Sequence, residues 1–228
     1  MATIAENLQR VRDRISQACS RFGRANDSVE LLAVSKTFPG VTVREAVAAG
    51  QCRFGENYVQ EAIAKITELA DLRAQLEWHL IGPLQSNKTR VVAEHFDWMH
   101  TIDRLKVAER LSEQRPPELP PLQVCIQVNT SGEASKSGVA PEDALALARA
   151  VSALPRLRLR GVMALPAPTT DPADQAQELA RVRAVYDALR DQGLPLDTLS
   201  MGMSQDLEAA IAQGSTLVRV GTALFGNR

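Results

Sequence analysis

Eight short apolar segments, rich in β-branched residues, alternate along the chain with longer segments whose apolar residues recur at helical spacing. The predicted strands cover residues 31–35, 52–55, 76–81, 97–101, 122–128, 157–164, 198–201 and 217–220. Predicted helices follow the first seven strands at residues 42–49, 59–72, 86–95, 104–114, 141–153, 173–192 and 205–213, and a short tail follows the eighth. This alternation, without a break in composition, favours an α/β fold built as a single (β/α)8 TIM barrel. An open, doubly wound sheet is the alternative.

An additional helix is predicted ahead of the first strand. Its apolar positions, Ile4, Leu8, Val11, Ile15, Ala18 and Phe22, recur at helical spacing over residues 3–22. The chain has 228 residues, of which 45% are hydrophobic, which suffices for one sizeable core. We therefore expect residues 1–228 to form one domain, with residues 1–27 as an N-terminal helix packed on the barrel.

The charge of the chain is almost balanced, with 26 Lys and Arg against 27 Asp and Glu. This balance offers no basic excess for nucleic acid and no polybasic run for a membrane surface. Charged residues interrupt the first fourteen positions, so they resemble neither a signal peptide nor a spanning segment, and we expect a cytoplasmic protein. Cys19, Cys52 and Cys125 lie far apart, which predicts no disulfide, no metal site and reduced, buried thiols.

Polar residues stand inside or directly after several of the predicted strands. Lys36 follows the first strand, Glu56 and Asn57 follow the second, His79 lies within the third, and Arg219 interrupts the eighth. Both faces of a barrel strand are buried, so such residues need a partner or a function. Because active sites of barrels form at the carboxyl ends of the strands, these residues predict one site at that rim.

Two loops after the seventh and eighth strands have the composition of a phosphate site. Their residues are Ser200, Met201, Gly202, Met203 and Ser204 in the first loop, and Gly221 and Thr222 in the second. Glycine lets the backbone approach an anion, hydroxyl groups donate hydrogen bonds, and a helix beginning near Gln205 would offer free N–H groups. Barrels commonly bind phosphate between these two loops.

A lysine that faces such a site suggests Schiff-base chemistry at Lys36, because a desolvated amine attacks aldehydes. The alternative is an ordinary rim lysine with its ammonium in water. For Arg219 the alternative to a ligand contact is a structural ion pair, and for His79 it is a hydrogen-bonded core histidine.

Several sequence blocks, in order, resemble the pyridoxal phosphate homeostasis proteins, which are related to the N-terminal barrel of alanine racemase. The blocks are LAVSKT (32–37), FGENY (54–58), WHLIGPLQSNK (78–88), SKSG (135–138), RGVM (160–163), LSMGMS (199–204) and VRVGT (218–222). The resemblance implies a monomeric fold-type III barrel that holds pyridoxal 5'-phosphate (PLP) as a Schiff base on Lys36. It also implies a role in intracellular PLP homeostasis, as a carrier or buffer of the cofactor without a settled catalytic activity, with apo PLP-dependent enzymes as recipients.

The resemblance also assigns roles to individual residues. Asn57 would lie beside the cofactor, and Arg219 would face its ring nitrogen. The phosphate would be held by Ser200 and Ser204 together with Gly221 and Thr222, in a loop that includes Gly202, and Met201 and Met203 would line the pocket. Some members have a second lysine where Phe38 stands here, so transfer of the cofactor between lysines at that position is not expected. Lys136 could replace it, although a solvated loop lysine is the simpler interpretation.

Two other functions use the same residues. A PLP-dependent racemase or other PLP enzyme would need a second acid or base, for which Tyr58, Tyr186 and His79 are the candidates. An arginine against the ring nitrogen argues against this, because most PLP enzymes place a carboxylate there. A barrel enzyme for a phosphorylated metabolite, without PLP, would explain the two loops alone.

Overall fold

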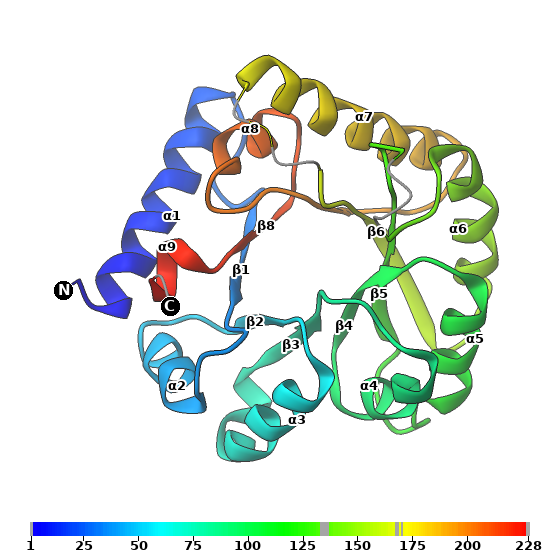
Figure 1. The fold of residues 1–228 in the computed structure, drawn as a ribbon, viewed down its shortest axis with the longest axis horizontal. Coiled ribbons are helices and arrows are strands. Elements are labelled where there is room, and N and C mark those ends of the chain that lie inside the picture. The colour runs from blue at the N-terminus through cyan, green and yellow to red at the C-terminus, as the bar shows by residue number, and fades with distance from the viewer. Residues whose placement is uncertain (1, 133–136, 167–168, 170, 227–228) are drawn as a thin grey trace.

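The fold is a closed barrel of eight parallel strands in sequence order, in a computed structural model that describes residues 2–132, 137–166, 169 and 171–226 (Figure 1). The strands are β1 (Glu30–Val34), β2 (Arg53–Glu56), β3 (Glu77–Leu80), β4 (Trp98–Ile102), β5 (Leu122–Gln127), β6 (Leu157–Met163), β7 (Thr198–Ser200) and β8 (Leu217–Val220). Strand β1 pairs with β8 as well as with β2, which closes the barrel. The predicted (β/α)8 barrel is confirmed, and the open sheet is wrong.

Helices surround the barrel (Figure 1). They are α1 (Ile4–Arg21), α2 (Gly40–Ala48), α3 (Val59–Glu68), α4 (Thr89–His95), α5 (Leu105–Gln114), α6 (Ala144–Ser152), α7 (Pro172–Asp191), α8 (Leu207–Ala212) and α9 (Thr222–Phe225), with short 3-10 helices at Ala70–Gln75, Ser86–Lys88 and Pro141–Asp143. Parallel strands bring all their carboxyl ends to one rim, so the loops that follow β1, β2, β7 and β8 meet there.

Helix α1 covers the seam between the last and the first strand. Thr3 and Glu6 form a capping box at its start, and its buried face packs against α8, α9 and α2. Helix α9 has only four residues, so α1 supplies the helical cover that β8 would otherwise lack (Figure 1).

The strands separate two hydrophobic layers. Outward-facing residues such as Trp78, Met99 and Val218 belong to the main core beneath the helices. Inside the barrel lie two small apolar clusters, formed by Leu32, Val34, Ile81 and Leu217 and by Trp98, Cys125 and Met163. Buried polar side chains from β3, β4, β7 and β8 share this interior, and they are central to the site below.

Three local predictions need correction. Helix α8 begins at Leu207 and not near Gln205, because the Asp206 side chain accepts a hydrogen bond from the Met203 N–H and holds the preceding residues in a turn. The predicted tail contains α9. Cys52 is exposed, because it precedes β2 at the amino-terminal end of the barrel, whereas Cys19 and Cys125 are buried as predicted.

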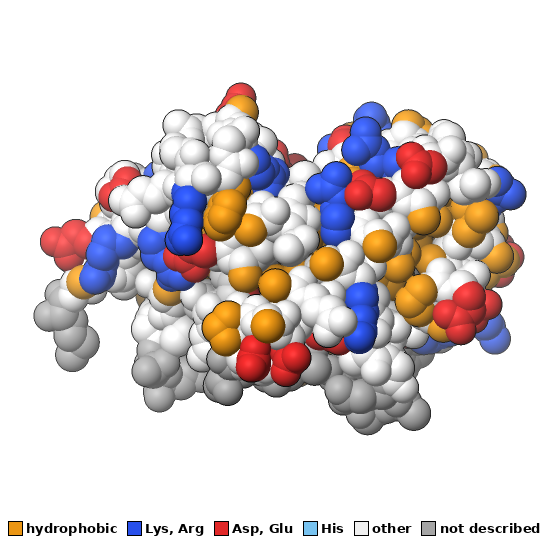
Figure 2. All heavy atoms as spheres, turned by 90° about the horizontal axis from the view of Figure 1, so that it is seen from above, with side chains coloured by type: hydrophobic (Ala, Val, Ile, Leu, Met, Phe, Trp, Pro, Cys, Tyr) orange, Lys and Arg blue, Asp and Glu red, His pale blue; other side chains and the backbone are white. Residues whose placement is uncertain are grey.

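The surface in Figure 2 carries acidic and basic side chains interspersed with small apolar areas. Among the described helices, none combines the length and the apolar character that crossing a bilayer requires. Within the same residues, no cluster of three or more His, Cys, Asp and Glu side chains is arranged to hold a metal ion.

Candidate functional site

Lys36 lies in a tight turn at the carboxyl end of β1. The turn is closed by a hydrogen bond from the Phe38 N–H to the Ser35 carbonyl (3.1 Å), and Thr37 adopts a left-handed conformation with φ of 66°. Lys36 is half-buried, and its side chain makes no hydrogen bond or ion pair with the described residues. Its amine is therefore available at the rim.

A buried network from β2 and α3 holds this turn. Lys65 donates hydrogen bonds to the Ser35 carbonyl (2.6 Å), to Glu56 Oε1 (2.8 Å) and to Glu61 Oε1 (2.8 Å). The Ser35 hydroxyl donates to the same Glu56 oxygen (2.6 Å), and the Thr37 N–H donates to Glu61. Three bonds use all the protons of an ammonium, so Lys65 is saturated and differs in this from Lys36.

Glu56 and Asn57 bring orphaned oxygens to the rim. Burial raises the pKa of the Glu56 carboxyl, although Lys65 and Ser35 oppose the shift. Glu56 Oε2 and Asn57 Oδ1 are buried without a hydrogen-bond partner among the described residues. Gly82 allows Asn57 to lie where it does, because a Cβ atom there would lie 2.1 Å from the Asn57 carbonyl oxygen. Unpaired buried oxygens of this kind favour a ligand with donor groups.

Arg219 reaches from β8 across the interior to the ends of β6 and β7. Its Nη1 donates to the Ser200 carbonyl (2.6 Å) and to Ser200 Oγ (2.8 Å), and its Nη2 donates to the Ala164 carbonyl (2.8 Å). No described carboxylate lies within ion-pair distance of it, so the described residues do not supply the structural ion pair considered from the sequence. Burial lowers the pKa of Arg219 to about 10, which still leaves it charged at neutral pH.

His79 is a buried, hydrogen-bonded core histidine. Its Nε2 lies 2.8 Å from Glu77 Oε1, and its Nδ1 lies 2.8 Å from Nε2 of His100. Burial lowers the pKa of His79, although Glu77 opposes the shift, and burial lowers the pKa of His100 strongly, which favours neutral rings at neutral pH. With both ring nitrogens occupied, His79 is not available as an acid or base at the rim.

The loop after β7 packs against α8 and is hydrogen-bonded to β8 and α1. Gly202 has φ of +97°, and a Cβ atom there would lie 2.5 Å from Cβ of Ala210 in α8. Its carbonyl accepts the Arg219 N–H (2.9 Å), and the Ser204 carbonyl accepts a hydrogen bond from Arg14 of α1 (3.2 Å). Met203 is exposed and does not belong to the hydrophobic core, so its side chain can line a site.

Two predicted contacts in this loop change. The Met201 side chain is fully buried in the main core, because strand alternation turns it outward once Ser200 faces the interior. The Ser200 hydroxyl is engaged by Arg219 and by His100 Nδ1 (2.9 Å). The Met201 side chain is therefore not placed to line the pocket, and the Ser200 hydroxyl is already engaged by protein groups and not by a phosphate.

Gly221 and Thr222 lie directly beside the Lys36 turn. A Cβ atom at Gly221 would lie 3.2 Å from the Val34 carbonyl oxygen, so this backbone runs against the end of β1. Gly221 precedes α9, and Thr222 is exposed at its first position. The N–H groups of both residues have no acceptor within the described part of the chain. Phe38 packs on Phe225 of α9, with ring centroids 5.1 Å apart.

The structure thus brings Lys36, Asn57, Gly221 and Thr222 together on three adjacent strand ends, with Ser204 one strand further. Lys136 lies outside the described residues. Sequence reasoning missed a set of supporting residues: Arg14, Glu61, Lys65, Glu77 and His100. His100 gave the same signal as His79, a polar residue within an apolar strand, and Glu61 and Lys65 stand four residues apart on one helix face.

Fold and site define a class: (β/α)8 barrels that present a free lysine amine beside glycine-rich backbone at the carboxyl-terminal mouth. The chain belongs to the alanine racemase N-terminal domain family, which it matches over residues 2–228, and within it to the pyridoxal phosphate homeostasis proteins. The pyridoxal phosphate homeostasis protein of Pseudomonas aeruginosa is 63% identical over 228 residues, which are 100% of this chain and 97% of the relative. That of Escherichia coli K12 is 56% identical, over 100% of this chain and 98% of the relative.

Two solved structures resemble this chain in fold over most of its length. PipY of Synechococcus elongatus, solved with PLP bound, is 42% identical with a TM-score of 0.82, over 93% of this chain and 100% of PipY. Alanine racemase of Corynebacterium glutamicum has a TM-score of 0.71 at 17% identity, over 99% of this chain but 61% of the racemase. The latter likeness concerns the fold alone.

Proposed function

We propose that this protein binds PLP covalently through Lys36 and carries or buffers it in PLP homeostasis. The observation that carries the proposal is the free Lys36 amine, which stands in a hydrogen-bonded turn beside backbone N–H groups of Gly221 and Thr222 that have no acceptor among the described residues. Relatives named for this role, and a PipY structure with PLP bound, support it.

The residues present fit the chemical parts of PLP. When bound, the cofactor supplies an aldehyde whose carbon forms a C=N bond with Lys36 Nζ, with loss of one water molecule. Ser204, Gly221 and Thr222 would hold the phosphate, and the orphaned Asn57 Oδ1 would accept from a ring substituent. Arg219 retains N–H donors beyond the three bonds it makes, and one of them would face the ring nitrogen.

These residues favour a carrier over an enzyme. An arginine that is charged at neutral pH and faces the ring nitrogen would keep that nitrogen unprotonated, which weakens the ring as an electron sink. Of the three candidate acids or bases, His79 is occupied, and the Tyr186 hydroxyl donates to the Leu196 carbonyl away from the rim (3.1 Å). The third candidate, Tyr58, is 57% exposed beside Asn57, so its side chain lies largely in solvent at the rim. A cytoplasmic monomer that loads apo PLP-dependent enzymes belongs to the same proposal.

The proposal is tested by the visible absorption of the protein after incubation with PLP. Wild type should acquire the absorption of a lysine-bound cofactor, and Lys36→Ala should not. Lys106→Ala, at an exposed lysine of α5, is the matched control and should behave as wild type. A wild type that takes up no PLP would contradict the proposal and would favour a barrel for another phosphorylated metabolite.

Carrier and enzyme are separated by turnover assays on the loaded protein. With a panel of L- and D-amino acids, we expect rates no higher than those of free PLP. Steady racemisation or transamination well above that level would overturn the carrier role while leaving PLP binding intact.

A further inference from the structure

A continuous line of polar contacts crosses the apolar interior of the barrel. It runs from Arg219 Nη1 to Ser200 Oγ (2.8 Å), to His100 Nδ1 (2.9 Å), then from His100 Nε2 to His79 Nδ1 (2.8 Å), and from His79 Nε2 to Glu77 Oε1 (2.8 Å). Ser200, His100 and His79 are fully buried, and Arg219 is 3% exposed. Glu77 begins β3, at the end of the barrel opposite the rim that carries Lys36.

The two ends of this line determine the direction of every hydrogen bond in it. A guanidinium only donates and a carboxylate only accepts, whereas a hydroxyl and a neutral imidazole each do both. Glu77 therefore accepts from the His79 Nε2–H, which leaves His79 Nδ1 as an acceptor for the His100 Nε2–H. His100 Nδ1 then accepts the Ser200 proton, and the Ser200 oxygen accepts from Arg219.

The ionisation of the groups agrees with this direction. Burial opposes ionisation of Glu77, but the hydrogen bond from His79, the electrostatic interaction with that ring and the charge of Arg53 lower its pKa. Arg53 Nε lies 3.1 Å from Glu77 Oε1. The His79 ring stacks on Trp98, with centroids 5.2 Å apart and planes 8° apart, so packing fixes its orientation as well.

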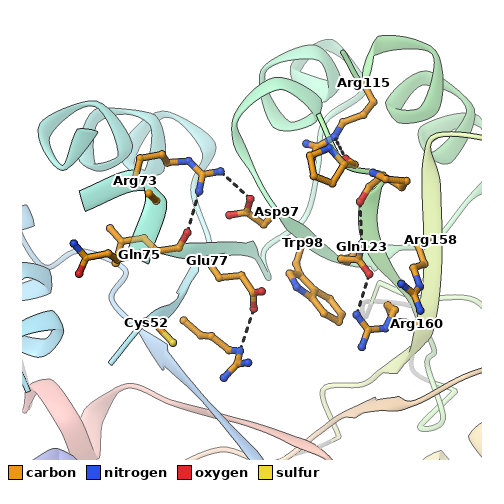
Figure 3. A pocket seen from close by; sticks show the side chains of 15 residues that line it. Cys52, Arg73, Gln75, Glu77, Asp97, Trp98, Arg115, Gln123, Arg158 and Arg160 are labelled. Carbon is orange, nitrogen blue, oxygen red and sulfur yellow. Dashed lines mark hydrogen bonds and ion pairs between the residues drawn. The ribbon is translucent and has the colours of Figure 1, made fainter. Parts of the chain in front are cut away.

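Glu77 is the member of the line whose side chain reaches solvent. With Trp98, Asp97 and Arg160, it lines a cavity of about 620 Å³ at the amino-terminal end of the barrel (Figure 3). Its side chain is 36% exposed, whereas every other member of the line is buried. Three neutral groups whose dipoles can align thus connect the carboxylate of Glu77 to the buried Arg219 at the other end of the line.

We propose that Glu77, His79, His100 and Ser200 form a one-way hydrogen-bond relay that orients Arg219 toward the cofactor ring, which makes Glu77 a positioning residue of a site at the other end of the barrel. The Ser200 hydroxyl turns its lone pair toward Arg219 and its proton toward His100, and the rest of the relay keeps His100 Nδ1 as the acceptor of that proton. The part that concerns the cofactor rests on the proposed function, whereas the relay itself does not.

The relay is tested first without cofactor, by long-range proton–nitrogen-15 correlation NMR of the histidine rings in the wild-type protein. The chain has three histidines, and His95→Gln assigns the third. We expect His79 and His100 both to be neutral, with the proton on Nε2 and a bare Nδ1. A charged ring, or a proton on Nδ1 of either histidine, reverses the donors and overturns the proposal.

The second test uses Glu77→Gln, with Glu30→Gln as its matched control. Both carboxylates contact Arg53, but only Glu77 contacts His79. Glu77→Gln should change the ring nitrogen signals of His100, which it does not touch, and should speed release of PLP by about 2- to 30-fold. Glu30→Gln should change neither.

Unchanged His100 signals and unchanged release in Glu77→Gln would overturn the relay. If wild type binds no PLP, the proposed function fails, and the NMR result still decides the relay by itself.

Discussion

Arg219 is the residue whose charge most directly shapes the chemistry of the proposed site. Carbonyl and hydroxyl oxygens surround it, and no carboxylate lies within ion-pair distance among the described residues. A bound ring nitrogen facing it would stay unprotonated.

Replacing Arg219 with Glu should therefore change the state of the ring. A carboxylate favours a protonated ring nitrogen, so the visible spectrum of the bound cofactor should shift, with a smaller effect on loading. Arg158→Glu, at an exposed arginine of β6 near the opposite end of the barrel, is the control. An unchanged spectrum in Arg219→Glu would speak against the contact.

The hydroxyls of Ser204 and Thr222 provide a second test at this scale. Removing both, as Ser204→Ala with Thr222→Ala, should weaken cofactor retention by about 1–3 kcal/mol, as expected for lost hydrogen bonds to a charged group. Equilibrium dialysis measures the effect, with Ser152→Ala on α6 as a control. Unaltered retention would place the phosphate elsewhere.

At the scale of elements, helix α3 determines the geometry of the β1 turn. Lys65 is 4% exposed and ties α3 to the Ser35 carbonyl and to Glu56 of β2. Removing one partner of a buried ion pair leaves the other charge uncompensated, which costs more than the pair contributes.

Lys65→Met should accordingly lower the free energy of unfolding by about 3–5 kcal/mol in urea denaturation. Adding Glu56→Gln should restore part of this loss, because the uncompensated charge is then removed. Lys106→Met, at an exposed position of α5, should stay within about 0.5 kcal/mol of wild type. A Lys65→Met protein as stable as that control would show that the network does not hold the turn.

For the whole molecule, the sequence predicts the barrel well and the interior poorly. Each strand lies within one residue of its predicted bounds, because buried parallel strands are continuous apolar runs. The start of α8 depends on a single side chain, Asp206, and periodicity does not register it. The hydrogen-bond partners of His100 are His79 and Ser200, which lie on other strands. These contacts follow from closure of the barrel, and the sequence alone does not indicate them.

The central claim is covalent attachment of PLP at Lys36, and borohydride reduction of the loaded wild-type protein followed by peptide mass mapping tests it most directly. We predict one reduced adduct per chain, on the peptide that contains Lys36. Reduction that leaves this peptide unmodified, or that places the adduct on another lysine such as the saturated Lys65, would contradict the account.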